Sequence, residues 1–221
     1  MAINVDAYQQ IKKSFGGKQV QLVAVSKTKP IEDIQGYYDM GQRDFGENYV
    51  QEFVEKVPAL PADIRWHFIG HLQRNKVKQI LPHVYLIHGV DSERLLNEIQ
   101  KEAAKANLKI RVLLQVFIAQ EETKFGFDQA ELSVVISDLT PWPNVEIMGV
   151  MGMSSLTDNL AQVRAEFQHL KHASQQLLAV KNDANIISMG MSSDYTIALE
   201  EGSTMIRIGS VLFGARDYSN K

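Results

Sequence analysis

Residues 21–40 read QLVAVSKTKPIEDIQGYYDM, a short apolar run followed by a stretch whose apolar residues recur at helical spacing. The first part, Gln21–Ser26, is rich in small and β-branched residues, as buried strands are. Pro30 indicates that the strand does not continue past this point, and the spacing beyond it predicts a helix over Ile31–Met40. This stretch therefore predicts one strand followed by one helix, the unit from which parallel α/β sheets are built.

The same unit recurs along the chain. Further strands are predicted over Asp44–Gly46, Trp66–Ile69, Val84–Gly89, Lys109–Phe117, Glu146–Met151, Ile186–Met189 and Met205–Ile208. Helices are predicted over Tyr49–Val57, Asn75–Leu81, Ser92–Ala106, Gln129–Asp138, Asn159–Val180 and Tyr195–Glu201, and one more, Val5–Phe15, precedes the first strand. Strand–helix alternation on this scale predicts an α/β protein with a single (β/α)₈ TIM barrel. An open sheet is the alternative if the second and seventh strands do not form.

Composition and charge limit the possible partners. The 221 residues are 45% hydrophobic and 22% charged, which is ordinary for a soluble globular protein, and no linker divides them, so we expect one domain over 1–221. The formal net charge of -3 gives no electrostatic reason to expect nucleic acid or an anionic membrane as a partner. There is no cysteine, signal peptide or long apolar segment, so the expected location is cytoplasmic.

Two loops have the composition of an anion site. In barrels, phosphate is often bound after strands 7 and 8. After the seventh predicted strand, Ser192 and Ser193 offer hydroxyls at the start of a helix, although Ser193 as a simple N-cap is the plainer alternative. After the eighth, Gly209 and Ser210 offer close backbone approach and another hydroxyl. Together the two loops predict a phosphate site at the carboxyl ends of these strands.

Arg207 lies inside the eighth predicted strand, between Ile206 and Ile208. If the two isoleucines face the helices, Arg207 points into the barrel, because side chains alternate along a strand. A buried arginine needs partners. A salt bridge to Glu47 or Asp44 is one possibility, and a bound ligand is the other.

Strand alternation likewise places Lys27 on the face that Val23 and Val25 share. In a closed barrel the first and last strands are neighbours, so Lys27 and Arg207 would meet at one mouth with the phosphate loops. Cationic neighbours and apolar walls favour the neutral amine that attack on a carbonyl requires. The combination suggests an aldehyde that also carries a phosphate, and pyridoxal 5'-phosphate fits. Lys29 is expected to be solvated.

Other kinds of site are less well supported. His67 and His71 would lie about 13 Å apart on an extended strand, too far to share a zinc ion, so no metal site is predicted. There is no nucleophile elbow, Walker loop or dinucleotide fingerprint. A Schiff-base aldolase acting on a phosphorylated sugar would use the same lysine without a bound cofactor.

Several segments closely resemble the pyridoxal phosphate homeostasis protein family (YggS/PROSC), which is related to the N-terminal domain of alanine racemases. They are VAVSKTKP, FGENYVQE, WHFIGHLQRNK, the two MGMS segments that begin at Met151 and Met189, and STMIRIGSVLFGARDY. The resemblance runs from about Leu22 to Tyr218. It implies a fold-type III barrel that holds pyridoxal 5'-phosphate as a Schiff base on Lys27.

The resemblance also implies roles for further residues. Arg207 would face the pyridine nitrogen, and the phosphate would be held by Ser192, Gly209 and Ser210 with nearby backbone amides. The positions that match pocket-lining residues of the family are Asn48, His67 and Met151, and Lys124 matches a family segment in the loop after the fifth strand.

The functional expectation is a non-catalytic protein of intracellular vitamin B6 homeostasis, acting as a monomer, with apoenzymes that need the cofactor as candidate partners. Racemases of this fold carry a second domain with a catalytic tyrosine, for which this sequence leaves no room after the eighth strand. An arginine at the ring nitrogen would also keep the ring unprotonated and a weak electron sink. The alternative is a cofactor-dependent enzyme, such as a racemase or decarboxylase of a small amino acid.

Overall fold

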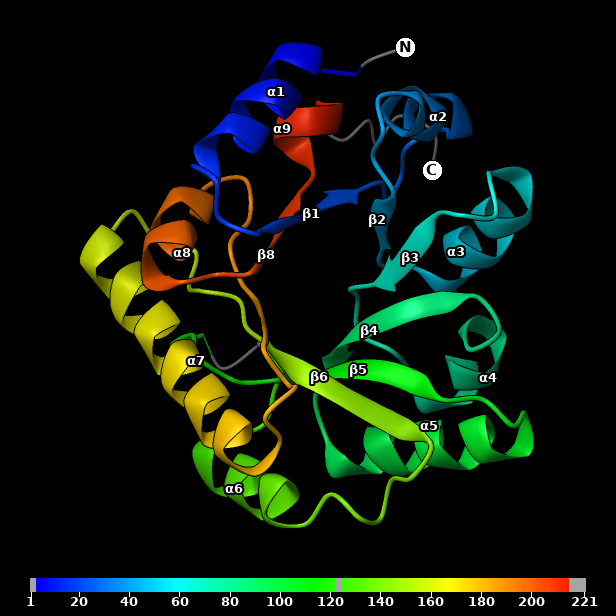
Figure 1. Ribbon diagram of the computed structural model, residues 1–221, viewed down its shortest axis with the longest axis vertical. Coiled ribbons are helices and arrows are strands. Elements are labelled where there is room, and N and C mark those ends of the chain that lie inside the picture. Colours follow the sequence, from blue (N-terminus) through cyan, green and yellow to red (C-terminus); the bar gives the residue numbers. More distant parts are fainter. Residues whose placement is uncertain (1–2, 122–124, 215–221) are drawn as a thin grey trace.

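The computed structural model describes residues 3–121 and 125–214. In this part of the chain, parallel strands close into a barrel in the order β1 to β8, with β1 paired to β8 (Figure 1). The strands are β1 (Gln21–Val25), β2 (Asp44–Glu47), β3 (Arg65–Phe68), β4 (Val84–Val90), β5 (Ile110–Gln115), β6 (Val145–Met151), β7 (Ile186–Ser188) and β8 (Met205–Ile208). The predicted barrel is confirmed, and the open-sheet alternative is wrong.

Helices surround the barrel (Figure 1). They are α1 (Val5–Ser14), α2 (Ile31–Asp39), α3 (Val50–Lys56), α4 (Val77–Ile80), α5 (Glu93–Lys105), α6 (Gln129–Ser137), α7 (Leu160–Val180), α8 (Tyr195–Glu201) and α9 (Ser210–Phe213). Two 3₁₀ turns, η1 (Val57–Ala59) and η2 (Arg74–Lys76), flank α3 and α4. The helix predicted over Asn75–Leu81 is therefore shorter than expected, because its first residues form η2.

The additional N-terminal helix α1 packs beside α9 (Figure 1). Aromatic rings connect α1 and α9 through α2. The ring centroid of Tyr37 in α2 lies 5.5 Å from that of Tyr8 and 4.9 Å from that of Phe213. The Tyr37 hydroxyl also donates to the Leu212 carbonyl at 2.6 Å. Since α9 is only four residues long, α1 helps to cover the barrel where the last helix is short.

Two layers of apolar side chains stabilise the fold. The larger lies between strands and helices and includes Ile206 and Ile208. The smaller fills the barrel interior and consists of Val23, Leu86, Leu113, Met151 and Met205. Because Val23 pairs with Arg207 across the β1–β8 seam, the predicted alternation of faces is confirmed for both strands.

Candidate functional site

A cavity of about 440 Å³ lies at the carboxyl ends of the strands, within the range of about 300–1,000 Å³ usual for small-molecule sites. Its walls come from the loops after β1, β2, β3, β6, β7 and β8. The predicted site residues that line it are Lys27, Asn48, Ser192, Ser193, Arg207, Gly209 and Ser210. The fold thus brings Lys27, Arg207 and both anion-type loops to one mouth.

The two other predicted site residues, His67 and Met151, lie deeper, and the cavity lining does not include them. Met151 belongs to the apolar cluster inside the barrel. His67 is fully buried, and its ring nitrogens bond to Asp44 and His88. Lys124 lies outside the described residues.

The backbone on both sides of Lys27 is clamped. The Lys56 ammonium donates to the Ser26 carbonyl at 2.9 Å, and the Thr28 N–H donates to Glu52 Oε2 at 2.7 Å. Thr28 has a φ of 61°, a left-handed conformation that a β-branched residue adopts only where its surroundings impose it. The clamp therefore fixes the turn that directs Lys27 toward the cavity.

The clamp is anchored on a buried ion pair. Lys56 Nζ contacts Glu47 Oε1 at 2.9 Å and Glu52 Oε2 at 2.8 Å. The Ser26 hydroxyl also donates to Glu47 Oε1, at 2.6 Å. Burial raises the pKa of Glu47 to about 6, although the charge of Lys56 and the bond from Ser26 act in the opposite direction. Removal of either partner would leave an uncompensated buried charge.

Arg207 is buried beneath the same cavity and is 4% exposed. Its Nη1 donates to the Ser188 carbonyl at 2.8 Å and to Ser188 Oγ at 2.6 Å, and its Nη2 donates to the Gly152 carbonyl at 3.0 Å. Burial lowers the pKa of Arg207 to about 10, and the charge of Asp194 partly offsets this effect, so the guanidinium is cationic at neutral pH. Nothing in the described residues pairs it with Glu47 or Asp44, so the salt bridge considered from the sequence is wrong.

The loop after β7 is shaped by Gly190 and Asp194. Gly190 has a φ of 97°, and a Cβ there would lie 2.6 Å from the Cβ of Ala198, so only glycine fits this turn. Asp194 accepts from the Met191 N–H and from the Ser154 hydroxyl, both at 2.6 Å. Asp194, and not Ser193, is the N-cap of α8, so the alternative that assigned Ser193 this role is wrong.

The chemistry of the lining fits pyridoxal 5'-phosphate. Asn48 Oδ1 is buried without a hydrogen-bond partner in the described structure, as expected for a group that awaits a ligand. The lining also combines three serine residues with the cationic Arg207 guanidinium and two lysines. Apolar walls for a flat ring are supplied by Val25, Ile69, Met153 and Met191.

Sequence reasoning missed three features of this site. Lys29 also lines the cavity and is only partly exposed, a position that strand alternation does not predict. The Lys56 clamp was missed, although the i,i+4 spacing of Glu52 and Lys56 is a usable signal. Ser188 was missed because its contact with Arg207 depends on the register of the barrel.

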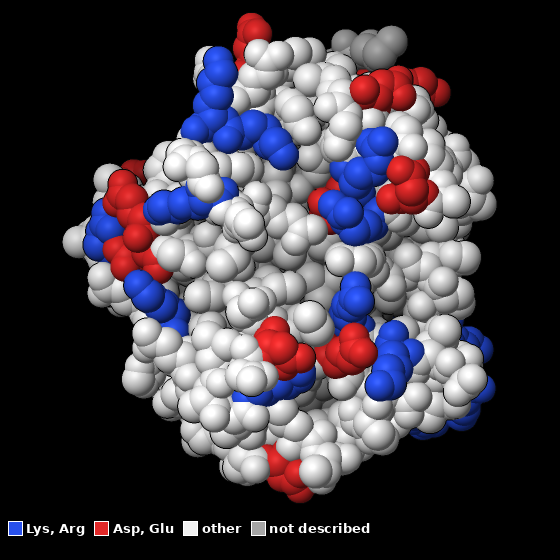
Figure 2. All heavy atoms as spheres, in the orientation of Figure 1, with Lys and Arg blue, Asp and Glu red and all other residues white. Residues whose placement is uncertain are grey.

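The described residues form neither a metal site nor a membrane-spanning helix. They contain no group of three or more His, Cys, Asp or Glu side chains placed to hold a metal ion. None of their helices has the length and apolarity that crossing a membrane requires. On the face that Figure 2 shows, basic and acidic side chains are mixed around a largely uncharged centre.

Comparison with known proteins places the chain in a family. The alanine racemase N-terminal domain family matches residues 5–217. A pyridoxal phosphate homeostasis protein of Aquifex aeolicus is 42% identical over 205 residues, which cover 92% of this chain and 90% of the relative. The chain belongs to the pyridoxal phosphate homeostasis protein family. The Homo sapiens protein of this family is 39% identical over 92% of this chain and 79% of its own length.

Solved structures agree with membership of the pyridoxal phosphate homeostasis protein family. PipY of Synechococcus elongatus, solved with pyridoxal phosphate bound, is 34% identical, with a TM-score of 0.86 over 95% of this chain and 99% of PipY. Alanine racemase from Bartonella henselae superposes with a TM-score of 0.74 over 99% of this chain and 62% of the racemase, at 17% identity. That second likeness establishes the fold alone, as predicted from the sequence.

Proposed function

We propose that this protein binds pyridoxal 5'-phosphate at the mouth of the barrel and acts in intracellular homeostasis of this cofactor without catalytic turnover. The observation that carries the proposal is the meeting of Lys27, Arg207 and the two serine-containing loops around one cavity. The binding of pyridoxal phosphate by PipY and the names of the relatives support it.

Each part of the cavity suits one part of the ligand. Lys27 would hold the cofactor covalently as a Schiff base, because its amine nitrogen can bond to the aldehyde carbon while the aldehyde oxygen leaves as water. Hydroxyls and backbone amides of Ser192, Ser193 and Ser210, with Gly209 allowing close approach, hold the phosphate. Arg207 donates to the ring nitrogen, and the Asn48 amide bonds a polar substituent of the ring.

Arg207 is also the reason to propose storage or delivery rather than catalysis. A guanidinium stays protonated at neutral pH and offers the ring nitrogen a hydrogen bond but no proton. An unprotonated ring withdraws electrons weakly, so it stabilises carbanion chemistry poorly. His67 and Met151, below the cavity, are not assigned direct contacts. A monomer of one domain in the cytoplasm, serving apoenzymes, completes the proposal.

The test begins with cofactor-free protein titrated with pyridoxal 5'-phosphate while absorbance is followed. We expect one cofactor per chain to remain after gel filtration, which also reports whether the protein is a monomer. The loaded protein is then mixed with single amino acids, and chiral and mass analysis of each mixture follows. Stoichiometric retention without product supports the proposal, whereas no retention, or sustained turnover of any amino acid, contradicts it.

A further inference from the structure

A continuous chain of hydrogen bonds crosses the interior of the barrel and ends on Arg207. Asp44 Oδ1 lies 3.0 Å from His67 Nε2, and His67 Nδ1 lies 2.9 Å from His88 Nε2. His88 Nδ1 lies 3.0 Å from Ser188 Oγ, which accepts from Arg207 Nη1 at 2.6 Å. The five side chains come from β2, β3, β4, β7 and β8, so only the closed barrel brings them together.

The direction of every bond follows from the two ends. An ionised carboxylate only accepts, so His67 Nε2 carries the proton that is donated to Asp44. A neutral His67 then accepts at Nδ1, which requires His88 to donate from Nε2 and to accept at Nδ1. The Ser188 hydroxyl must donate to His88 Nδ1, and its oxygen lone pairs are left for Arg207. Along the chain from Arg207 to Asp44, each residue therefore donates a hydrogen bond to the next one.

Burial and electrostatics agree with this direction. His67, His88 and Ser188 are completely buried. Burial lowers the pKa of His67, although Asp44 acts in the opposite direction. Burial also lowers the pKa of His88, and the charge of Arg207 acts in the same direction. Burial alone would raise the pKa of Asp44, but hydrogen bonds from Arg65 and His67 hold it at about 2. Both histidines are therefore neutral and Asp44 is ionised at neutral pH.

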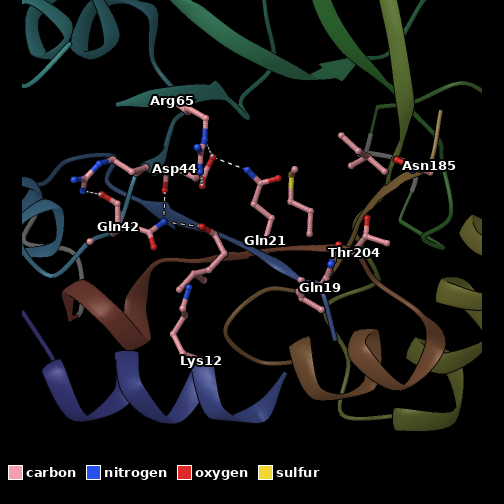
Figure 3. Close-up of a pocket in the computed structure, with 14 residues that line it drawn as sticks. Lys12, Gln19, Gln21, Gln42, Asp44, Arg65, Asn185 and Thr204 are labelled. Atoms are coloured by element: carbon pink, nitrogen blue, oxygen red, sulfur yellow. Dashed lines mark hydrogen bonds and ion pairs between the residues drawn. The ribbon is translucent and has the colours of Figure 1, made fainter. Parts of the chain in front are cut away.

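The two ends of the chain open onto different cavities. Arg207 faces the cofactor cavity. Asp44 lines a cavity of about 650 Å³ at the amino ends of the strands, where Arg65 and Gln21 converge on its carboxylate (Figure 3). Arg65 donates to Asp44 at 2.7 and 2.5 Å, and Gln21 donates at 2.6 Å. These bonds hold the carboxylate in place as the fixed acceptor of the chain.

We propose that Ser188, His88 and His67, anchored on Asp44, are positioning residues that hold the Arg207 guanidinium in the orientation that receives the cofactor ring. No carboxylate in the described residues forms an ion pair with Arg207, so all of its side-chain hydrogen bonds there go to neutral oxygens of Ser188 and Gly152. Of these oxygens, only the Ser188 hydroxyl can rotate, and His88 Nδ1 prevents that rotation. This inference rests on the proposed function, because it concerns the same cofactor.

The first test needs no variant and no cofactor. In ¹⁵N-labelled protein, NMR shifts of the imidazole nitrogens report which nitrogen of each ring is protonated. We expect His67 and His88 both to be neutral and protonated on Nε2 at pH 7. A proton on Nδ1 of either ring, or a charged ring, would overturn the chain.

The second test compares variants of the holoprotein. Ser188→Ala removes the hydroxyl that bonds Arg207, and His88→Leu removes the ring that bonds Ser188. Leu86→Met is a volume-conserving control on β4, the strand that carries His88. We expect the cofactor dissociation constant to rise about tenfold in the first two variants and to stay unchanged in the control, as outer partners of a bound group usually act. We also expect the absorbance maximum of the retained cofactor to shift in the first two variants and not in the control.

The outcomes separate this inference from the proposed function. Thermal unfolding of each cofactor-free variant shows whether it folds. If wild-type protein binds the cofactor and folded variants match Leu86→Met in affinity and spectrum, the inference is overturned and the proposed function stands. If wild-type protein fails to bind, the proposed function and this inference both fall, whatever the NMR result.

Discussion

The two ends of the barrel differ in how their polar groups are satisfied. At the amino ends of the strands, the Asp44 carboxylate accepts from Gln21, Arg65 and His67, so its charge is fully compensated by the protein. At the carboxyl ends, Asn48 Oδ1 is buried without a partner in the described structure. The larger cavity, of about 650 Å³, lies at the first end, and the smaller one, of about 440 Å³, at the second.

The proposed cofactor site therefore lies at the end of the barrel that has the smaller of these two cavities. Barrels place chemistry at the carboxyl ends of their strands because the loops there are free to vary. At the amino ends, side-chain hydrogen bonds and ion pairs serve the fold, and through His67 they also reach Arg207. The predictions below test whether the two ends can be separated in this way.

The largest effect is expected at Lys27. Lys27→Ala removes the amine that we propose forms the covalent link, and we expect the cofactor dissociation constant to rise about 1,000-fold, roughly 4 kcal/mol. Lys29→Ala is the matched control, since Lys29 lines the same cavity. Equilibrium dialysis measures both variants, and an equal loss in the two would contradict the assignment of Lys27.

Lys56→Met tests the clamp behind Lys27. It leaves Glu47 buried without its cation, and we expect the free energy of unfolding to fall by about 3 kcal/mol, as for other broken buried pairs. Urea denaturation measures the change. Lys56→Arg keeps the charge, so its free energy of unfolding should fall less. Equal decreases in the two variants would show that the clamp does not require the charge.

Arg207→Ala acts within the proposed cofactor cavity. We expect a roughly 30-fold weaker cofactor affinity, about 2 kcal/mol, with the barrel still folded by circular dichroism. Retention on dialysis equal to that of wild-type protein would show that Arg207 does not contact the cofactor.

Stability should fall in mild acid. His67 and His88 have lowered pKa values in the folded state, so below their unfolded value of about 6.5 the unfolded chain binds more protons and is favoured. Glu47 acts oppositely, because its raised pKa of about 6 lets the folded state take up a proton first. We expect a net loss of roughly 1–2 kcal/mol between pH 6.5 and 5.5.

The matched variant for this pH effect is Glu47→Gln. It removes the opposing carboxyl, so its stability should fall more steeply than that of wild-type protein over the same range. Urea denaturation at each pH measures both slopes. A wild-type slope of zero or of opposite sign would show that the two histidines are not held neutral.

The smallest effect is expected at the other end of the barrel. Arg43 lines the larger cavity but pairs with Asp63 at the surface, at 2.8 Å. Arg43→Ala should change stability by less than about 1 kcal/mol, as exposed ion pairs usually do, and leave cofactor affinity unchanged. A large loss of affinity would show that this end contributes directly to binding.

The fold and the centre of the site could be predicted from sequence because they depend on local regularities. Alternation along β8 placed Arg207 on the inward face, and closure of the barrel made β1, which leads to Lys27, a neighbour of β8. The βα repeat gave the architecture, while the end of α3 and the start of α4 were missed because 3₁₀ turns directly follow α3 and directly precede α4.

What could not be predicted depends on register between distant strands. The bond between His88 and Ser188 joins residues 100 positions apart, and neither residue carries a local signal of it. The placement of His67 below the cavity depends equally on the stagger of β3 against its neighbours. Lys29 reaches the cavity because the backbone turns after Val25, which alternation along a strand does not describe.

The central claim is that Lys27 holds the cofactor, and one measurement tests it most directly. Holoprotein is reduced with borohydride, which makes a Schiff base permanent, and the modified peptide is located by mass spectrometry. The account predicts a pyridoxyl group on Lys27 at about one per chain. Modification of Lys29, or no modification of a protein that retains the cofactor, would contradict it.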